Sequence, residues 1–378
     1  MDLKNYKSGS FTKESGYRSF HPEFLNREWV ISQPELNSLL EEANIRLGEL
    51  NAFSIILPDV ETFLRMHLVK EATQSSRIEG TRTTIDEAVL EAKDIDIEKR
   101  DDWQEVQNYV NALKFCIQRL EQLPLSTRLM REAHKILMEG VRGKDKMPGE
   151  FRTSQNWIGG ATLRDARFIP PHHSLVPDLM SDLEKFLNNT DIYVPTLIRI
   201  GMVHYQFEAI HPFLDGNGRI GRLLITLYLV NQRVLRKPTL YISDFIEKNR
   251  SVYYDKLISV SEKHEMQQWL KFFLVGIIET ANQAIDTFNK ILVIRETLET
   301  ESLIKFGRRL SNAKALLLYL YKKPVVTVAD VMTELRTSKQ TANSLIQEFE
   351  NHGILRERTG FSRNRVFVFE QYLSLFTR

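Results

Sequence analysis

The chain has 378 residues, of which 42% are apolar and 26% are charged, and its formal net charge is +2 at pH 7. These are ordinary values for a globular protein, and the length predicts two or three domains. The single cysteine, Cys116, excludes an internal disulfide framework and a cysteine-rich zinc site.

The N-terminus is polar and lacks the apolar run of a signal peptide, and no stretch reaches the roughly 20 apolar residues that a membrane span needs. We therefore expect a cytoplasmic protein with no membrane partner. Cys116 lies at a helical position among apolar residues, which favours a small core residue over a catalytic thiol.

Residues 1–100 are predicted to form an irregular start followed by helices. Residues 1–30 contain glycines and many hydroxyls, whereas the leucine spacing over 34–50 is helical. A second helix is predicted from Pro58 to about Ser76 and ends near Gly80. Thr84 then begins another helix as its N-cap, and Glu87 completes a capping box.

Residues 101–300 are predicted to be mostly helical, with one hairpin. Between 143 and 171 the helical pattern gives way to turn signals such as Pro148-Gly149 and Gly159-Gly160. Residues 157–158 and 167–169 are predicted to be short strands around a polar tip. The predicted helices cover 101–122, 126–140, 176–187, 195–209 and 219–230, and several more fill 243–300.

Residues 308–378 differ from the rest in charge and pattern. They hold 12 Lys/Arg and 6 Asp/Glu, which gives +6, so the preceding 307 residues carry −4. Helices are predicted at 310–321, from 327 and over 337–351, and a strand at 365–369. Three helices and a hairpin predict a winged helix-turn-helix, and the basic charge is typical of a domain that meets a polyanion.

The segment from His211 to Arg222 carries the most chemistry. It links two apolar helices, and its glycines permit a tight loop whose backbone closely approaches a ligand. The unpaired N–H groups of the following helix form an anion site. Arg219 and Arg222 are three residues apart on that helix and can hold two phosphates. Asp215 is a hard oxygen ligand for Mg²⁺, and His211 can accept a proton near neutral pH.

Each of these residues also has a structural interpretation, since a lone histidine is usually structural and a glycine loop is often only a turn. Together, however, they match the Fic family motif, His-x-Phe-x-Asp/Glu-Gly-Asn-Gly-Arg-x-x-Arg, at every specified position. Phe213 is expected in the core. The chain therefore resembles Fic (Fic/Doc) family protein adenylyltransferases over about residues 30–300.

The resemblance implies a mainly α fold with a Fic-type helical core, a small β-hairpin flap and a helical N-terminal region. It implies an N-terminal helical region at 1–100 that carries the inhibitory motif and a catalytic core at 101–300, whereas the winged helix-turn-helix at 308–378 is predicted from its general layout alone. ATP would lie over the glycine loop, with His211 as the base that deprotonates a protein Ser, Thr or Tyr hydroxyl and Asp215 as the Mg²⁺ ligand. The ATP-binding residues expected in the motif are Gly216, Asn217, Gly218, Arg219, Ile220, Gly221 and Arg222.

An upstream match involves Ser75 and Glu79. The sequence Ser-Ser-Arg-Ile-Glu-Gly from Ser75 is similar to the inhibitory motif of Fic proteins, Ser/Thr-x-x-x-Glu-Gly/Asn. Glu79 would pair with Arg222 and remove that arginine from the γ-phosphate, so that ATP binds unproductively. The alternative is that Glu79 is a solvated charge at a helix end.

The predicted hairpin resembles the family's flap, which aligns the target segment by backbone pairing. Its residues are expected to contact the edge of the nucleotide, or else to belong to an ordinary surface hairpin. Asn249 and Tyr253 are expected to face the purine. The flap residues concerned are Asn156, Trp157, Ile158 and Gly159. The histidines His172, His173 and His204 are interpreted as structural or surface residues rather than as metal ligands, because their spacing matches no metal site.

Two functions remain open at this point. The first is an adenylyltransferase that modifies protein hydroxyls, its own included, and is held back by Glu79; transfer of UMP, phosphocholine or phosphate fits the intact motif less well than AMP. The second is a DNA-binding transcriptional regulator whose nucleotide pocket acts as a sensor. In the tail, Lys339, Gln340 and Asn343 would reach bases or phosphates and Arg363 and Arg365 the backbone, although winged helices also dock proteins.

Overall fold

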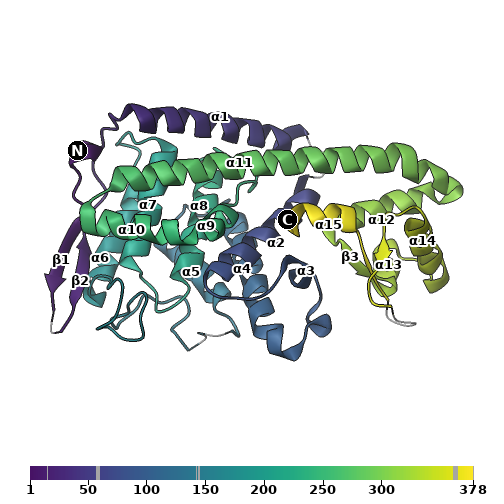
Figure 1. Cartoon of the computed structure of the whole chain (residues 1–378), viewed down its shortest axis with the longest axis horizontal. Helices are drawn as coiled ribbons and strands as arrows, with labels where there is room; N and C mark the ends of the chain where they lie inside the picture. Colours follow the sequence, from purple (N-terminus) through teal and green to yellow (C-terminus); the bar gives the residue numbers. More distant parts are fainter. Residues whose placement is uncertain (15, 57–59, 142, 144, 361–364, 378) are drawn as a thin grey trace.

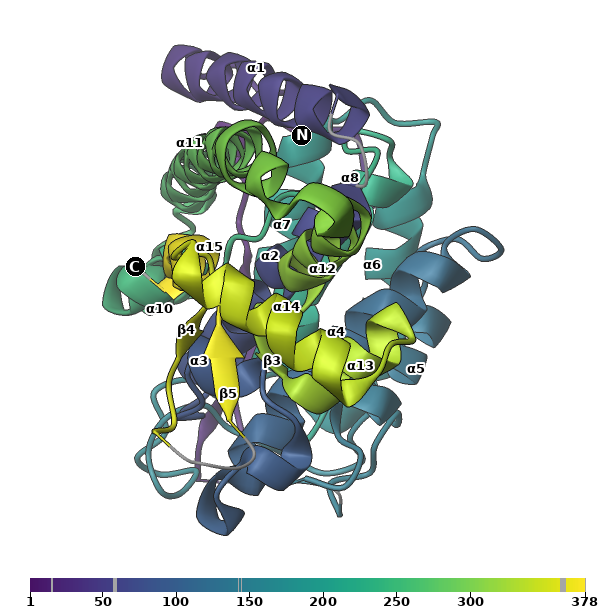
Figure 2. The same ribbon diagram turned by 90° about the vertical axis from the view of Figure 1, so that its right-hand side faces the viewer.

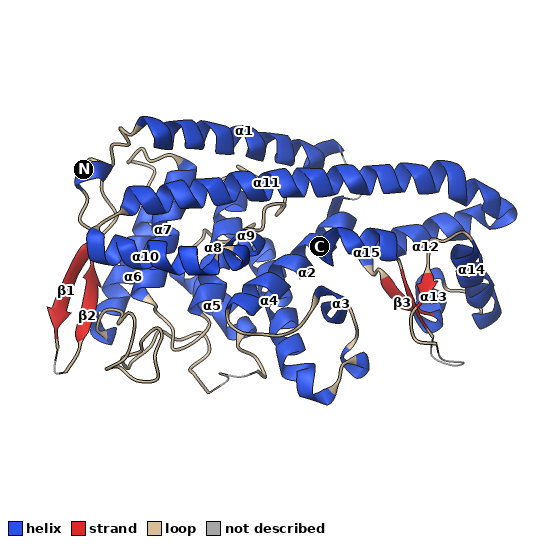
Figure 3. Cartoon of the chain, in the orientation of Figure 1, coloured by secondary structure: helices blue, strands red, loops and turns tan. Residues whose placement is uncertain are grey.

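The computed structural model describes residues 1–14, 16–56, 60–141, 143, 145–360 and 365–377. Over these residues the chain is mainly helical, as predicted (Figure 3). None of the helices among them is long and apolar enough to cross a membrane. The α-helices are α1 (Pro34–Ile56), α2 (Val60–Ile78), α3 (Ile85–Ala88), α4 (Arg100–Arg119), α5 (Thr127–Leu137), α6 (Val176–Asn188), α7 (Thr196–Ile210), α8 (Asn217–Asn231), α9 (Ser243–Lys248), α10 (Arg250–Lys263), α11 (Met266–Thr297), α12 (Leu310–Lys322), α13 (Val328–Leu335), α14 (Lys339–Asn351) and α15 (Glu370–Thr377).

The centre of the fold is the pair α7 and α8. Every residue of α7 from Leu197 to Ile210 is buried, and α8 is buried from Arg219 to Leu229. Both helices are mostly apolar and are buried around their circumference by neighbours. These neighbours include α4, α5, α6, α10 and α11. The loop that joins α7 to α8 is thereby fixed at both ends by the core.

Two long helices lie side by side along one edge of the molecule (Figure 1). They are α1 and α11. Helix α11 continues beyond the core to the C-terminal unit, which is formed by α12–α15 and a three-stranded sheet. Past α11 the chain makes a π-helical turn and a 3-10 segment, Leu303–Arg309, with a sharp change of direction at Gly307. The positive φ of 51° explains why a glycine stands there.

The first 30 residues were predicted to be irregular, and this was wrong. Strands β1 (Gly9–Lys13) and β2 (Arg18–Pro22) form an antiparallel pair in which Phe11 lies opposite Phe20. The phenyl rings of these two residues lie 5.2 Å apart. Phe20 is fully buried because it also packs against Phe168 of the predicted flap, a contact that local sequence cannot reveal.

The C-terminal unit contains the predicted helices in order, α12, α13 and α14, followed by the antiparallel strands β4 (Arg356–Glu357) and β5 (Val366–Val368). Two elements were not predicted: β3 (Val325–Thr327), which pairs with the other edge of β5, and the final helix α15. In Figure 2 these elements lie in front of the core. Arg363, expected at the wing tip, lies outside the described residues.

Helix α2 connects the C-terminal unit to the core. Near its start, the ring of Phe63 lies 5.0 Å from that of Tyr321 in α12, and the imidazole of His67 lies 5.1 Å from the ring of Phe376 in α15. Near its end, Ser75 is fully buried against α8. One helix therefore contacts both the C-terminal unit and Arg222 of α8.

Candidate active site

Helix α7 ends at His211, whose backbone adopts the left-handed conformation with φ 50° and ψ 61°. This conformation is uncommon for a residue with a side chain and is found at helix C-termini and functional sites. The N–H of His211 donates to the carbonyl of Phe207 at 2.9 Å, which closes the last turn. The chain then turns away, and the imidazole stays beside the start of α8.

The imidazole of His211 is held in one tautomer. Its Nδ1 lies 3.2 Å from the carbonyl oxygen of Glu208, and a carbonyl only accepts, so Nδ1 carries the proton and Nε2 remains an acceptor. Burial lowers the pKa of His211 to about 4, so that the ring is neutral at pH 7. A neutral imidazole with a free acceptor nitrogen can take a proton from a hydroxyl.

Buried polar side chains brace the loop that follows. His134 of α5 stacks on the ring of Phe213 at 3.9 Å, donates from Nε2 to the carbonyl of Asp215 and accepts the N–H of Gly149 at Nδ1. The guanidinium of Arg152 donates to the carbonyls of His211 and three other residues. The backbone of the loop is therefore fixed by bonds to segments distant in sequence.

The loop ends at the N-terminus of α8. Gly216 adopts φ 75°, a conformation that favours glycine, and α8 starts at Asn217. The side chain of Asn217 turns back on the loop, where it accepts from the N–H of Phe213 and donates to its carbonyl, both at 2.8 Å. The first N–H groups of α8 therefore stay available for an anion.

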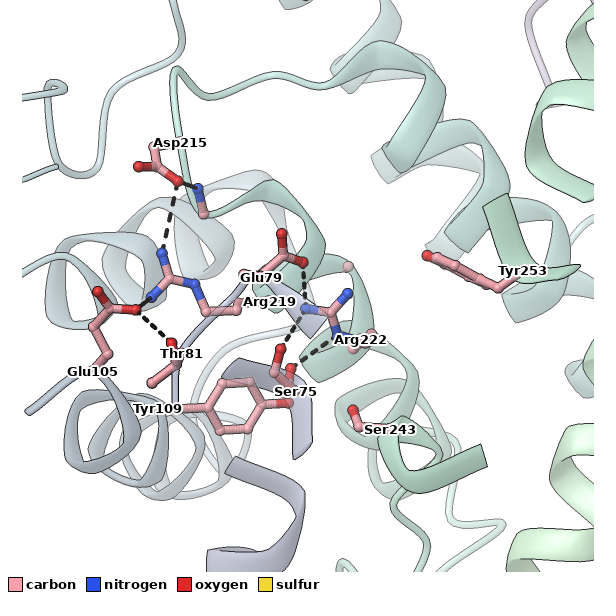
Figure 4. A network of polar contacts seen from close by, with 12 residues as sticks. Ser75, Glu79, Thr81, Glu105, Tyr109, Asp215, Arg219, Arg222, Ser243 and Tyr253 are labelled. Atoms are coloured by element: carbon pink, nitrogen blue, oxygen red, sulfur yellow. Dashed lines mark hydrogen bonds and ion pairs between the residues drawn. The ribbon is translucent and has the colours of Figure 1, made fainter. Parts of the chain in front are cut away.

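Arg222, one turn into α8, is held by the end of α2 (Figure 4). Its Nε and Nη2 donate to the hydroxyl and the carbonyl of Ser75, each at 2.9 Å, and Nη2 also pairs with Oε1 of Glu79 at 2.6 Å. The side chain of Arg222 is 1% exposed and that of Glu79 33%. Burial alone would raise the pKa of Glu79, but the charge of Arg222 lowers it below its usual value.

Arg219 is directed elsewhere. Its guanidinium forms a buried ion pair with Glu105 at 3.2 Å and approaches Asp215 at 3.7 Å (Figure 4). Glu105 also accepts the hydroxyl of Thr81 at 3.1 Å. The two arginines were expected to hold two phosphates together; instead Arg219 is 3% exposed and ties α8 to α4.

A cavity of about 440 Å³ lies between the motif loop, the flap and α10. This volume suits a nucleotide-sized ligand. The loop side is polar, whereas α10 contributes two tyrosines and two aliphatic residues together with Arg250 and Ser261. The residues of the sequence analysis that line the cavity are Glu79, Trp157, Ile158, Gly159, His211, Asp215, Gly216, Asn217, Gly218, Arg222 and Tyr253.

Other predicted nucleotide contacts lie outside this lining. The amide of Asn156 donates to the carbonyls of His211 and Phe213, so it supports the loop from behind. The amide of Asn249 donates to the carbonyl of Phe245. Ile220 and Gly221 are buried in α8 and do not line the cavity.

The flap is a hairpin held by a single bridge between Ile158 and Phe168, without the two regular strands that were expected. Asp165 accepts the N–H groups of Ala161 and Thr162, both at 2.7 Å, and so closes its tip. The short pairing leaves Trp157 39% exposed beside the cavity.

Several residues of the site were not predicted from the sequence. Glu208, Arg250 and Tyr254 line the cavity, and His134 braces the loop. Glu208 lies four residues after His204 and three before His211, so the helical period alone could have placed it on the same face of α7. His134 had no such signal, because its partner lies 81 residues away.

The donor set of the site fits a magnesium ion that is carried by a nucleotide. Asp215 lines the cavity, and its side chain is 47% exposed. Among the described residues no group of three or more His, Cys, Asp or Glu could hold a metal. Mg²⁺ commonly binds through one or two carboxylates and the phosphates of its substrate, so a single aspartate beside an anion site is suitable.

Comparison with known proteins gives matches over most of this region. Residues 37–118 match the family described as Fic/DOC family N-terminal, and residues 124–229 match the Fic/DOC family. A protein adenylyltransferase Fic from Aedes aegypti is 32% identical over 125 residues, which are 33% of this chain and 22% of the relative. A probable protein adenylyltransferase from Aquifex aeolicus is 27% identical over 249 residues, 64% of this chain and 70% of the relative.

The chain thus spans about a fifth of the length of the mosquito relative. Among solved structures, a Fic family protein from Desulfovibrio desulfuricans superposes with a TM-score of 0.59 at 21% identity, over 91% of this chain and 98% of that one. This likeness shows a shared fold.

Proposed function

We propose, from the premise that this chain belongs to the Fic/DOC family, that it is a protein adenylyltransferase that moves AMP from ATP onto hydroxyl side chains. The observation that carries the proposal is the arrangement around the cavity. His211, Asp215, Gly218 and Arg222 line one side of it, and the amino end of α8 opens there.

The chemistry follows from positions and charges. The triphosphate would lie against the N-terminus of α8, with the loop amides and Arg222 as its partners. His211 would take the proton of the target hydroxyl at Nε2 as its oxygen attacks the α-phosphorus. The bond from the α-phosphorus to the bridging oxygen breaks, and pyrophosphate leaves. Mg²⁺, bound by Asp215 and the phosphates, would neutralise their charge.

Autoinhibition by Glu79 is part of the proposal. Its carboxylate stands over the start of α8 and binds Arg222, which is where a γ-phosphate would otherwise be held. The guanidinium of Arg222 is buried, whereas the side chain of Glu79 is 33% exposed, so water reaches the pair only from the Glu79 side. Such a charge-assisted hydrogen bond would compete with a phosphate for Arg222. In this state the enzyme would bind ATP in a pose unsuited to transfer.

The target is proposed to be a protein with an exposed Ser, Thr or Tyr, and the protein itself is one such target. The flap supports this, since it forms only a single bridge between Ile158 and Phe168 beside the cavity. Unpaired backbone in a flap can bind an extended peptide. Trp157, Ile158 and Gly159 would then contact both the peptide and the edge of the nucleotide.

We propose the functional division 1–100 for inhibition, 101–300 for catalysis and 308–378 for binding of a partner. In the last part, Lys339 and Gln340 at the start of α14 are exposed, whereas the amide of Asn343 donates to the carbonyl of Lys339. DNA and protein both remain candidates for that partner. A regulator that only senses nucleotide would not need the base His211.

The test is transfer of label from α-labelled ATP with Mg²⁺. We expect weak self-labelling of the wild type, stronger labelling of Glu79→Gly and none of His211→Ala. Glu121→Gly is a matched control, because Glu121 is exposed in the turn after α4 much as Glu79 follows α2. Equal background labelling in all four proteins would contradict the enzyme and favour the sensor.

A further inference from the structure

A second carboxyl group reaches the cavity beside Glu79. Glu208 of α7 lines the cavity and is 8% exposed. Its Oε1 is inaccessible to solvent and has no hydrogen-bond partner among the described residues. Buried polar atoms are nearly always paired, so an unpaired carboxyl oxygen beside a functional site needs an explanation.

The two carboxyl groups contact α8 in matching ways. A Cβ added at Gly218 would collide with Oε1 of Glu79, and a Cβ added at Gly221 would collide with Oε1 of Glu208. The two glycines are three residues apart and so lie one above the other on the same face of the helix. Arg222 follows directly, and the same Cβ at Gly218 would approach its Nη1. The charge of Arg222 also acts on Glu208.

In the present state Arg222 forms its ion pair with Glu79 and, among the described residues, not with Glu208. A buried guanidinium that loses its carboxylate partner is strongly destabilised. When Glu79 withdraws, Glu208 is the carboxyl group of the cavity that already lies against the neighbouring residue, Gly221.

We propose that Glu208 is a positioning residue for Arg222, which takes over as its counter-ion when Glu79 withdraws. It would hold the guanidinium from the Gly221 side, while the nucleotide phosphate takes the Gly218 side. The exchange requires Glu208 to give its proton to solvent. This inference rests on the proposed function, because it describes how the enzyme passes from the inhibited to the active state.

The electrostatics of the inhibited state agree with this exchange. Burial raises the pKa of Glu208 to about 8; Arg222 lowers it and the charge of Glu79 raises it. At pH 7 the side chain is therefore protonated while Glu79 is in place. Removal of Glu79 takes a negative charge away from Glu208 and leaves the positive charge of Arg222 without the carboxylate of Glu79. Both changes favour ionisation of Glu208.

The other titratable groups around Glu208 do not change charge between pH 6.5 and pH 9. Burial lowers the pKa of His204 to about 3 and that of His211 to about 4, so both are neutral. Burial raises the pKa of Tyr253 and of Tyr254 above the usual value, so both stay protonated. Glu79 itself is ionised whether it is bound or released.

Release of Glu79 should therefore be coupled to loss of one proton. The released fraction would rise by up to about tenfold per pH unit as long as the inhibited state keeps the proton, and would level off near the pKa of about 8. The released fraction must rise with pH, and not fall, since the inhibited state binds more protons than the released state.

The experiment measures initial rates of self-labelling with ATP and Mg²⁺ at intervals from about pH 6.5 to about pH 9. The full-length proteins are the wild type, Glu79→Gly, Glu208→Gln and the double variant. At each pH the rate of the wild type is divided by that of Glu79→Gly, which cancels the pH dependence of the chemistry itself. The same ratio is taken for Glu208→Gln over the double variant.

We expect the first ratio to rise several-fold up to about pH 8 and then to stay constant, and the second to be flat. The double variant should also show a raised KM for ATP, with little change in kcat, compared with Glu79→Gly. A flat first ratio, or equal slopes in both ratios, would overturn the inference. The first ratio needs no change at Glu208, so the test holds even if Glu208→Gln does not fold. Absence of labelling in Glu79→Gly at every pH would instead contradict the proposed function.

Discussion

The carboxylate of Glu79 covers the backbone of Gly218, and no side chain could stand at Gly218 without displacing it. Because α8 begins at Asn217, the carboxylate occupies the end of the helix where N–H groups and the helix dipole favour a negative charge. Glu79 therefore lies at the anion site while it pairs with Arg222.

We predict that Gly218→Ala abolishes labelling even though it breaks the contact with Glu79. The added methyl group would occupy the space that the phosphate needs, and a misplacement of about 1 Å can cost about 10²-fold in rate. Labelling and calorimetric ATP binding would be compared with Glu79→Gly. Gly48→Ala is the control, because Gly48 lies in α1 with no atom near its Cβ position. Strong labelling by Gly218→Ala would contradict this prediction.

Arg219→Ala is expected to lower stability by about 1.5–3 kcal/mol, because it removes a buried charge-assisted hydrogen bond to Glu105. The free energy of unfolding in urea gives the measurement. Arg222→Ala, by contrast, should chiefly weaken ATP binding in the Glu79→Gly background. If Arg219→Ala unfolds like the wild type but loses ATP binding, Arg219 acts on the nucleotide directly.

Acid should destabilise the protein partly through His204. This buried ring donates from Nδ1 to the carbonyl of Gly221 at 3.0 Å and accepts the hydroxyl of Tyr253 at Nε2 at 2.9 Å. Burial lowers the pKa of His204 to about 3, whereas the unfolded chain takes up the proton near its ordinary value of 6.5. The unfolded state thus binds more protons between these values, so this contribution to stability is full above pH 6.5 and falls as the pH falls.

The test compares the wild type with His204→Gln in urea at several pH values. We expect the slope of unfolding free energy against pH between about 4 and 6 to be smaller in the variant by about 1.4 kcal/mol per pH unit, which corresponds to one proton. Identical slopes would show that His204 is protonated in the folded state.

Cys116 should be inert in the folded protein. It is fully buried in α4, and burial raises the pKa of its thiol to about 12. At pH 8 a thiol reagent should therefore react roughly 10³-fold more slowly with the native protein than with the protein in urea. Rapid stoichiometric reaction of the native protein would contradict the burial of Cys116.

Helix positions could be predicted from sequence because they depend on local periodicity and caps. Thr84 and Glu87 form the expected capping box at the start of α3, and α6 and α7 begin and end within about one residue of their predicted bounds. β1 and β3 could not be found in this way. Each is a short strand whose pairing depends on partners elsewhere, such as Phe367 opposite Val326.

For the site, the motif named the residues but not the directions of their side chains. The ion pair of Glu79 with Arg222 was predicted, and it is present. Arg219 was expected to face the same ligand, yet three residues on a helix also rotate a side chain by about 60°, enough to reach a different partner. That partner, Glu105, is 114 residues away. Such a choice is made by tertiary packing and is invisible in the local sequence.

Helix α2 has 19 residues, which corresponds to roughly 28 Å of rigid rod. One end packs against aromatic rings of α12 and α15, and the other end leads to Glu79, which pairs with Arg222. A small tilt at the first end must move the second, since a helix transmits displacement with little bending. We therefore expect a genetic selection for constitutively active protein to recover changes at Phe63 or Tyr321 as well as at Glu79. The contacts of α2 with α12 and α15 would then determine how readily Glu79 leaves Arg222.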